Sequence, residues 1–342
     1  MAHNRDHWFI TQATAVWKIP VSHDLAASAA GAPGVLRKGI SEFPQLVGYN
    51  HFGDPELFST NGVDYLFVPV THYESGSGPP IIVVLRGDSL AYVSHARLPT
   101  GAESAWCALD PSGRLCLPGG AGVFTFHSVN YAALRDAQRL ELGTGRPFVL
   151  NDERGAPILD IDFHQGGVIS PSGELLFVVA GFHDQDRPGD GIHVFTLTVN
   201  PASGLVTTRR IRRSTQASRP FAYQVSTGID GEEPEGITFW DLNDGRSPGV
   251  QGEVHVLVLD NGFVGEDDVY IKHYTSAIHA DRRFLGAEWG IPSNPFNTIT
   301  EAYNYAWAGA DLKIKTGLYP ESLSFERSVR IRAEGGPITI GR

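Results

Sequence analysis

The stretch PEGITFWDLNDG (residues 234–245) joins a polar entrance, an apolar run and a tight turn, and three earlier stretches align with it. They are GDPELFSTNG (53–62), SAWCALDPSG (104–113) and HQGGVISPSG (164–173). Each is followed by further apolar segments, and their starts lie roughly 50 to 70 residues apart. That spacing is typical of a four-stranded blade with its loops. The repeat therefore predicts a β-propeller, for which five blades are favoured and four or six stay open.

Short apolar segments recur from about residue 45 to residue 275, and turn residues separate them. The clearest strand candidates are Tyr65–Val70, Ile81–Leu85, Leu175–Ala180, Ile192–Leu197, Val254–Leu259 and Val269–Tyr274. A helical pattern is almost absent before residue 298. We therefore expect an all-β fold. Strands within Phe9–Val21 and the stretch Ile278–Trp289 would supply a fifth blade, closing the ring with both ends of the chain.

Composition and motifs exclude several classes of function. The net charge is −11, which argues against general nucleic-acid binding because phosphate contacts need a basic face. The one basic run, Arg209–Arg213, is predicted to lie on a solvated outer edge strand, where its charges block edge pairing. The sequence contains no P-loop, dinucleotide fingerprint, serine-hydrolase elbow or zinc spacing.

The N-terminus shows no apolar signal segment, and no long apolar span follows it, so we expect a cytoplasmic protein that does not contact a membrane. Cys107 and Cys116 flank the turn at residues 110–113. A hairpin paired symmetrically about that turn would bring the thiols face to face, whereas a bulge at Gly113 would separate them. We predict two free, reduced cysteines.

A family resemblance lies in the run Glu232-Glu233-Pro234-Glu235-Gly236-Ile237. It resembles the E-G motif that opens an inner strand in gluconolactonase-like, strictosidine-synthase-like and phytase-like propellers. In those families the glutamate points into the central channel and often ligates a divalent metal, commonly calcium. The resemblance therefore implies a channel-facing Glu235 that could ligate Ca²⁺.

A second resemblance covers about fifty residues at the C-terminus: residues 296–302, 317–323 and 335–341 resemble the first coil of pectin-lyase-like right-handed β-helices. Thr298 and Glu301 predict a capping box on a helix that runs to about Trp307. One coil cannot bury its own face. We therefore expect a propeller over residues 1–290 and a coil over 291–342 that packs on it. The coil could also meet a partner protein or a second copy through Leu318, Tyr319, Leu323 and Phe325.

The repeat alignment places Asp54, Ala105, Gln165 and Glu235 at one equivalent position of four blades, where the innermost strand begins. Innermost strands line the channel, so the oxygens of Asp54, Gln165 and Glu235 would converge there. Carboxylate and amide oxygens suit calcium, and the same groups could hold a substrate by hydrogen bonds. The remaining candidates are the possible general bases His51 and His164 and the substrate contacts Trp106 and Trp240.

Several functions fit this pattern. The favoured one is an enzyme acting on a small organic molecule in the channel, with calcium polarising a carbonyl during lactone or ester hydrolysis and a histidine or Glu235 moving the proton. A metal-free cyclase or isomerase, in which Trp106 shelters a developing cation, is an alternative. A single-site carbohydrate-binding module and a scaffold that docks through the C-terminal coil also stay open.

Overall fold

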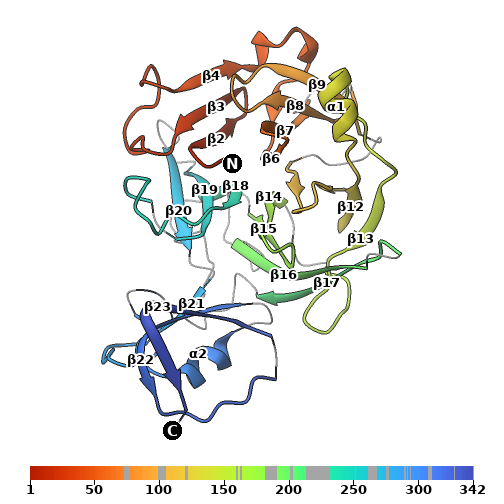
Figure 1. The fold of residues 1–342 in the computed structure, drawn as a ribbon. Helices are drawn as coiled ribbons and strands as arrows, with labels where there is room; N and C mark the ends of the chain where they lie inside the picture. The colour runs from red at the N-terminus through yellow and green to blue at the C-terminus, as the bar shows by residue number, and fades with distance from the viewer. Residues whose placement is uncertain are drawn as a thin grey trace.

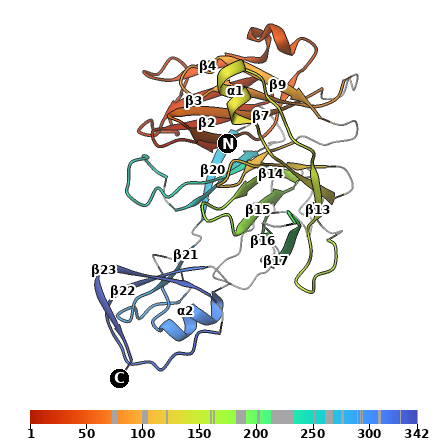
Figure 2. The same ribbon diagram turned by 45° about the vertical axis from the view of Figure 1, so that its right-hand side comes forward.

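The computed structural model describes residues 1–72, 78–98, 105–119, 122–158, 161, 164–181, 191–200, 203–212, 232–250, 252–260, 268–274, 277–288, 290, 292, 294–306, 310–326 and 328–341. Five sheets stand around a central axis, which confirms the predicted all-β propeller with five blades (Figure 1). The amino terminus lies near the middle of the ring (Figure 1). The carboxy terminus belongs to a smaller unit beside the ring, as a second view also shows (Figure 2).

Each blade is built from consecutive, antiparallel strands. Blade one contains β1 (Ala2–His3), β2 (His7–Gln12), β3 (Ala15–Pro20) and β4 (Leu36–Gly39). Blade two contains β5 (His51–Phe52), β6 (Glu56–Thr60), β7 (Val63–Thr71), β8 (Ile81–Arg86) and β9 (Tyr92–Arg97). Blade three contains β10 (Ala108–Leu109), β11 (Leu115–Pro118), β12 (Val123–His127) and β13 (Arg146–Val149).

Blade four contains β14 (His164–Ile169), β15 (Leu175–Ala180), β16 (Gly191–Val199) and β17 (Val206–Arg212). Blade five contains β18 (Glu232–Phe239), β19 (Val254–Asp260) and β20 (Asp268–Tyr274), so its sheet has three strands within the described residues. The short helical segments of the ring are η1 (Ile40–Glu42), η2 (Pro44–Leu46) and α1 (Tyr131–Ala137).

The ring closes differently from the expectation that both chain ends share one blade. Blade one consists of N-terminal strands alone, and the described part of 278–289 adds no strand to it. Instead β21 (Ala277–Ala280) pairs in parallel with β22 (Asp311–Tyr319) of the C-terminal unit. Trp289, at the end of that stretch, lies outside the described residues. No strand of blade five therefore pairs with blade one in the described chain, and side-chain packing must hold that junction.

Apolar side chains pack between neighbouring blades because successive strand residues face opposite sides of a sheet. Phe67 of β7 packs toward blade three, whereas Val68 beside it packs toward blade one. Four such interfaces contain 14, 11, 15 and 10 buried hydrophobic residues, going from blades one and two round to blades four and five, and the last of them continues into eleven buried hydrophobic residues of the C-terminal unit. The interface between blades five and one contains seven. The closing junction therefore has the smallest apolar core.

The C-terminal unit is a small parallel sheet covered by one helix. Its strands lie in the order β21, β22 and β23 (Arg330–Ile340), and α2 (Ile299–Tyr305) packs against them. Thr298 caps the helix as predicted, because its Oγ1 accepts a hydrogen bond from the Glu301 N–H at 3.1 Å. The helix ends at Tyr305, and Trp307 lies outside the described residues. The boundary predicted at residue 290 stays a prediction.

The two cysteines are free and buried. Cys116 pairs across the hairpin with Ala108 instead of Cys107. The thiols therefore belong to different interfaces, Cys107 between blades two and three and Cys116 between blades three and four. This confirms the prediction of two unbridged thiols.

The basic run is only partly solvated. As predicted, it lies on β17, the outermost strand of blade four, and Arg209 is exposed. Arg210, however, is 2% exposed, and its Nε lies 3.3 Å from Oε1 of Glu153. Alternation along the strand turns this side chain inward, so it acts as a buried charge with an acidic partner. Arg213 lies outside the described residues.

The described residues contain no helix that is long and apolar enough to span a bilayer.

Candidate functional site

One residue from each blade meets in a single layer across the channel: Met1, Asp54, Trp106, Gly166 and Gly236. Asp54 pairs in parallel with Trp106 through an N–H bond to the Ala105 carbonyl at 2.7 Å, and its own carbonyl accepts from Cys107 at 3.1 Å. The inner strands of blades one, four and five reach the same level through Met1, Gly166 and Gly236. The layer joins all five blades around the Asp54 carboxylate.

Asp54 is buried, at 1% exposure, and both of its carboxylate oxygens have partners. Oδ1 contacts the amino group of Met1, and Oδ2 accepts a hydrogen bond from the Ile237 N–H at 3.1 Å. Burial lowers the pKa of the amino group to about 5, against the charges of Glu56, Cys107 and Glu235, which raise it.

The two glycines of this layer are required by the close approach of three backbones. A Cβ atom at Gly166 would lie 2.9 Å from Oδ2 of Asp54 and 2.9 Å from the Cα of Gly236. A Cβ atom at Gly236 would meet Oδ1 of Asp54 and lie 2.7 Å from the Met1 nitrogen. Any larger residue would displace the carboxylate, so the layer closes only with glycine at both positions.

Gln165 and Glu235 are extra residues in two equivalent bulges. In blade four the pairing passes from His164 with Ala180 directly to Gly166 with Val179, and Gln165 is left out. In blade five it passes from Pro234 with Val258 directly to Gly236 with Leu257, and Glu235 is left out. A bulge bends its strand and re-aims the side chain of the extra residue. The bulges thus give Gln165 and Glu235, both half-buried, equivalent places beside the Asp54 layer.

A second pair of carboxyl groups accompanies these residues. The Gln165 amide nitrogen donates to Oε1 of Glu233 at 2.6 Å. Burial raises the pKa of Glu235 from 4.5 to about 7, and the neighbouring Glu233 carboxylate adds to that rise. Burial also raises the pKa of Glu56 to about 7, although the Leu57 N–H and the amino terminus oppose it. Two carboxyl groups near the channel are therefore half-protonated at neutral pH and can both give and accept a proton.

The structure places the other predicted site residues at different depths. His51 and His164 are half-buried at the start of the inner strands β5 and β14, and burial lowers the pKa of His51. The His164 ring lies 5.4 Å from that of Phe124. These two histidines are thus at the same end of their inner strands as Gln165 and Glu235.

Both tryptophans are buried in blade interfaces. The Trp106 ring is fully buried, packs on Gly167 and lies 5.9 Å from Phe124. Trp240 is 6% exposed and stacks on His3 with ring centres 4.3 Å apart. Both rings therefore belong to the buried cores of these interfaces, which the repeat alignment did not show.

The arrangement does not fit a calcium ion held by Asp54, Gln165 and Glu235. Both oxygens of Asp54 accept hydrogen bonds from protein donors, so this carboxylate is already engaged. Within the described ranges of the chain, no three His, Cys, Asp or Glu side chains gather in a way that could hold a metal ion. The chemistry considered below uses only the chain's own groups.

No protein-family model and no curated protein matches this sequence. Solved structures with a similar fold include a GH43 β-xylosidase/α-arabinofuranosidase from a compost microbial metagenome, determined with xylotriose in a calcium-free form. The two sequences are 16% identical, the match covers 78% of this chain and 89% of the other, and the TM-score is 0.43.

A GH43 enzyme from Xanthomonas citri is 15% identical, with 78% and 86% of the two chains covered and a TM-score of 0.41. The periplasmic gluconolactonase of Pseudomonas aeruginosa is 17% identical, with 79% and 70% covered and a TM-score of 0.35. Each of these similarities concerns the fold and comes with a low sequence identity. The predicted resemblance to gluconolactonase-like propellers stays a prediction.

Sequence reasoning missed Glu56, Glu233 and the amino group of Met1. Glu56 follows Asp54 by two residues and Glu233 precedes Glu235 by two, so their nearness in the sequence to the predicted site residues could have indicated both carboxyl groups. The amino group carries no sequence signal, because its place depends on how blade one enters the ring.

Proposed function

We propose that this protein is an enzyme that hydrolyses a small lactone or ester at the mouth of the channel, with Glu235 as general acid and base. The observation that carries the proposal is the half-buried Glu235 carboxyl, re-aimed by a bulge and held at a pKa of about 7. A group whose pKa lies near the working pH transfers protons in both directions with the least penalty.

The reaction needs one proton to move twice. The ionised Glu235 accepts a proton from water as the water oxygen forms a bond to the carbonyl carbon of the substrate. The tetrahedral intermediate then collapses, the bond to the leaving oxygen breaks, and the Glu235 carboxyl donates its proton to that oxygen. A lactone thereby opens to a hydroxy acid, and the enzyme returns to its starting state.

The neighbouring groups have supporting roles in this proposal. Glu233, fixed by Gln165 at 2.6 Å, keeps a negative charge beside Glu235 and so maintains its raised pKa. Burial lowers the pKa of His51, which favours its neutral form, and this residue lies at the start of the inner strand β5. Asp54 belongs to the layer that closes the channel and positions the bulges without touching substrate.

The alternatives are less well supported by these positions. A cyclase would use Trp106 to shelter a cation, but that ring packs inside the interface between blades three and four. Calcium assistance is not part of this proposal, because both oxygens of Asp54 accept hydrogen bonds from protein donors. A carbohydrate-binding role would show binding of a glycan without turnover.

The experiment measures hydrolysis of δ-valerolactone and 4-nitrophenyl acetate by the unaltered chain and by Glu235→Gln. We expect the variant to lose on the order of 10²- to 10⁴-fold in kcat. The matched control is Glu326→Gln, an exposed glutamate in the C-terminal unit, which should keep full activity. Unchanged hydrolysis by Glu235→Gln with an intact fold, or no hydrolysis of either substrate by the unaltered chain, would contradict the proposal.

A further inference from the structure

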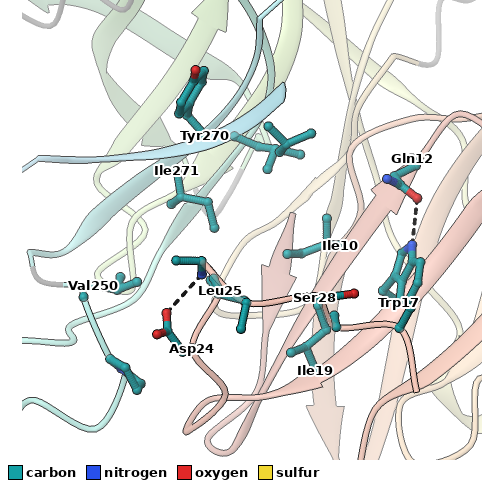
Figure 3. A pocket seen from close by; sticks show the side chains of 18 of the residues that line it. Ile10, Gln12, Trp17, Ile19, Asp24, Leu25, Ser28, Val250, Tyr270 and Ile271 are labelled. Atoms are coloured by element: carbon teal, nitrogen blue, oxygen red, sulfur yellow. Dashed lines mark hydrogen bonds between the residues drawn. The ribbon is translucent and has the colours of Figure 1, made fainter. Parts of the chain in front are cut away.

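A cavity of about 640 Å³ lies between blade one and blade five, outside the channel. Its walls are the facing sides of β2 and β3 on one side and of β19 and β20 on the other (Figure 3). Ile10 and Trp17 line it from blade one, and Leu257 and Ile271 line it from blade five. This volume lies in the usual range of small-molecule pockets, roughly 300 to 1,000 Å³.

The cavity exists because the closing junction is only partly filled. One part of the junction is filled by Trp8, Trp240 and Leu242, which are buried. Ile10 and Ile271 are only half-buried, and they face each other across the open space (Figure 3). An apolar space of this kind favours an apolar occupant, because removing apolar surface from water lowers the free energy of the system.

The connection between β3 and β4, residues 21–35, covers one side of the cavity. It carries the run Leu25-Ala26-Ala27-Ser28-Ala29-Ala30, all of which line the space. Leu25 and Ala29 pack on the junction core, whereas Ala26, Ala27 and Ser28 are exposed. A connection of this length without helix or strand is uncommon in compact domains and often covers a binding site. Small side chains leave room beneath it.

Two neighbouring histidines, His255 and His273, determine which nitrogen of the cavity-lining His273 carries a proton. The His255 Nε2 lies 2.7 Å from the Trp240 carbonyl, which only accepts, so Nε2 carries the proton. Burial lowers the pKa of His255 to about 3, so its Nδ1 is an unprotonated acceptor at neutral pH. The His273 Nδ1 lies 3.2 Å from it and must therefore be the donor.

The protonation of the other His273 nitrogen, Nε2, follows from these two hydrogen bonds. Burial also lowers the pKa of His273, which keeps the ring neutral, so a ring with its proton on Nδ1 has a bare lone pair on Nε2. His273 lines the cavity. The lining is mainly apolar and also contains the polar residues Gln12, Asp24, Ser28 and Tyr270, and His273 adds to it a neutral hydrogen-bond acceptor of fixed identity.

We propose that this cavity, called here the closing pocket, binds a small, neutral, mainly apolar molecule that carries a hydroxyl or N–H donor. The donor bonds to Nε2 of His273, and the apolar body lies between Ile10 and Ile271 beneath the β3–β4 connection. This site is separate from the proposed catalytic site at the channel, and its occupancy does not depend on the chemistry proposed there.

The test uses two matched probes, 2-naphthol and 2-methoxynaphthalene, which share one apolar body and differ in the hydroxyl donor. Their dissociation constants are measured by fluorescence titration of the unaltered chain. We expect saturable binding of both and a roughly tenfold preference for 2-naphthol, the usual effect of one hydrogen bond. Equal affinities, or no saturable binding of either probe, would overturn the proposal without recourse to any variant.

Two variants locate the site. His273→Phe keeps a ring of similar shape without the acceptor, so it should remove the preference for 2-naphthol and leave 2-methoxynaphthalene binding unchanged. Ala29→Phe places a ring in the pocket from the β3–β4 connection and should weaken both probes at least tenfold. Glu235→Gln, at the channel, should alter neither affinity. A preference that survives His273→Phe, or probe binding that survives Ala29→Phe, would contradict the assignment.

Discussion

The ring is closed in two ways, at the axis by polar groups and farther out by apolar ones. At the axis, five blades meet around the buried Asp54 carboxylate, with backbones so close that Gly166 and Gly236 cannot carry a side chain. At the outer junction of blades five and one, seven buried hydrophobic residues pack and a cavity of about 640 Å³ remains. At the axis, hydrogen bonds to Asp54 fix the positions of the blades relative to one another. At the outer junction, apolar side chains pack without filling the space, so a cavity remains.

The two closures provide different environments for the two proposed sites. The polar closure creates a buried environment in which the pKa of Glu56 and of Glu235 rises to about 7, which suits proton transfer. The incomplete apolar closure creates a space suited to binding. The polar closure is tested by removing hydrogen-bonding partners, and the apolar closure is tested by changing the size of side chains.

The largest expected effect comes from Asp54→Ala. This change leaves the Ile237 N–H and the Met1 amino group without an acceptor in a buried layer, which should lower the free energy of unfolding by about 3–5 kcal/mol. Urea denaturation followed by circular dichroism measures it. Asp54→Asn, which keeps one acceptor oxygen, should lose about half as much. If Asp54→Ala unfolds at the same urea concentration as the unaltered chain, the axial layer does not hold the ring.

The next effect compares two truncations at different blade interfaces. Leu66→Ala, in the filled interface of blades one and two, should cost about 2–5 kcal/mol, because the side chain is fully buried. Ile271→Ala, which borders the existing cavity and is half-buried, should cost less than about 1.5 kcal/mol. Equal losses in urea denaturation would mean that the closing junction is as tightly packed as the others.

A smaller effect concerns pH. The pKa of Glu56 and of Glu235 rises from 4.5 to about 7 on folding, so the folded chain binds more protons than the unfolded chain between those values. Their contribution to stability is therefore present below pH 4.5 and lost as the pH rises to 7, by roughly 1–3 kcal/mol per group. Buried histidines act in the opposite direction, so the comparison must be made against Glu235→Gln. That variant should lose less stability than the unaltered chain from pH 5 to pH 7.

The smallest expected effect is that of a chelator. Because both carboxylate oxygens of Asp54, one of the predicted ligands, accept hydrogen bonds from protein donors, neither EDTA nor added calcium should shift the melting temperature by more than about 1 °C. Scanning calorimetry provides the test. A clear rise in melting temperature with calcium would restore the metal site that the sequence resemblance implies.

Most of the ring was predictable from the sequence, because turns and apolar runs recur at one spacing whichever blade they form. The alignment also placed Gln165 and Glu235 at equivalent positions, since both precede a glycine at the start of an inner strand. It could not show that both are bulge residues, because a bulge depends on the pairing of a distant strand. The direction of Trp106 was missed for a related reason: one residue of register decides whether a side chain faces the channel or the core.

The closing pocket was beyond sequence reasoning altogether. It depends on how Ile10 and Ile271, which lie at opposite ends of the ring sequence, come to face each other. Its acceptor depends on a proton arrangement across His255 and His273 that only their geometry reveals. The roles of His51, His164 and Glu235 in catalysis stay predictions until activity is measured.

The most direct test of the central claim is a titration of the Glu235 carboxyl by carbon-13 NMR in protein labelled at the glutamate side-chain carboxyl. The signal is assigned by its loss in Glu235→Gln. The account predicts a pKa near 7, about 2.5 units above the ordinary glutamate value of 4.5. A pKa near 4.5 would show an ordinary, ionised carboxylate and would contradict a general acid at this position.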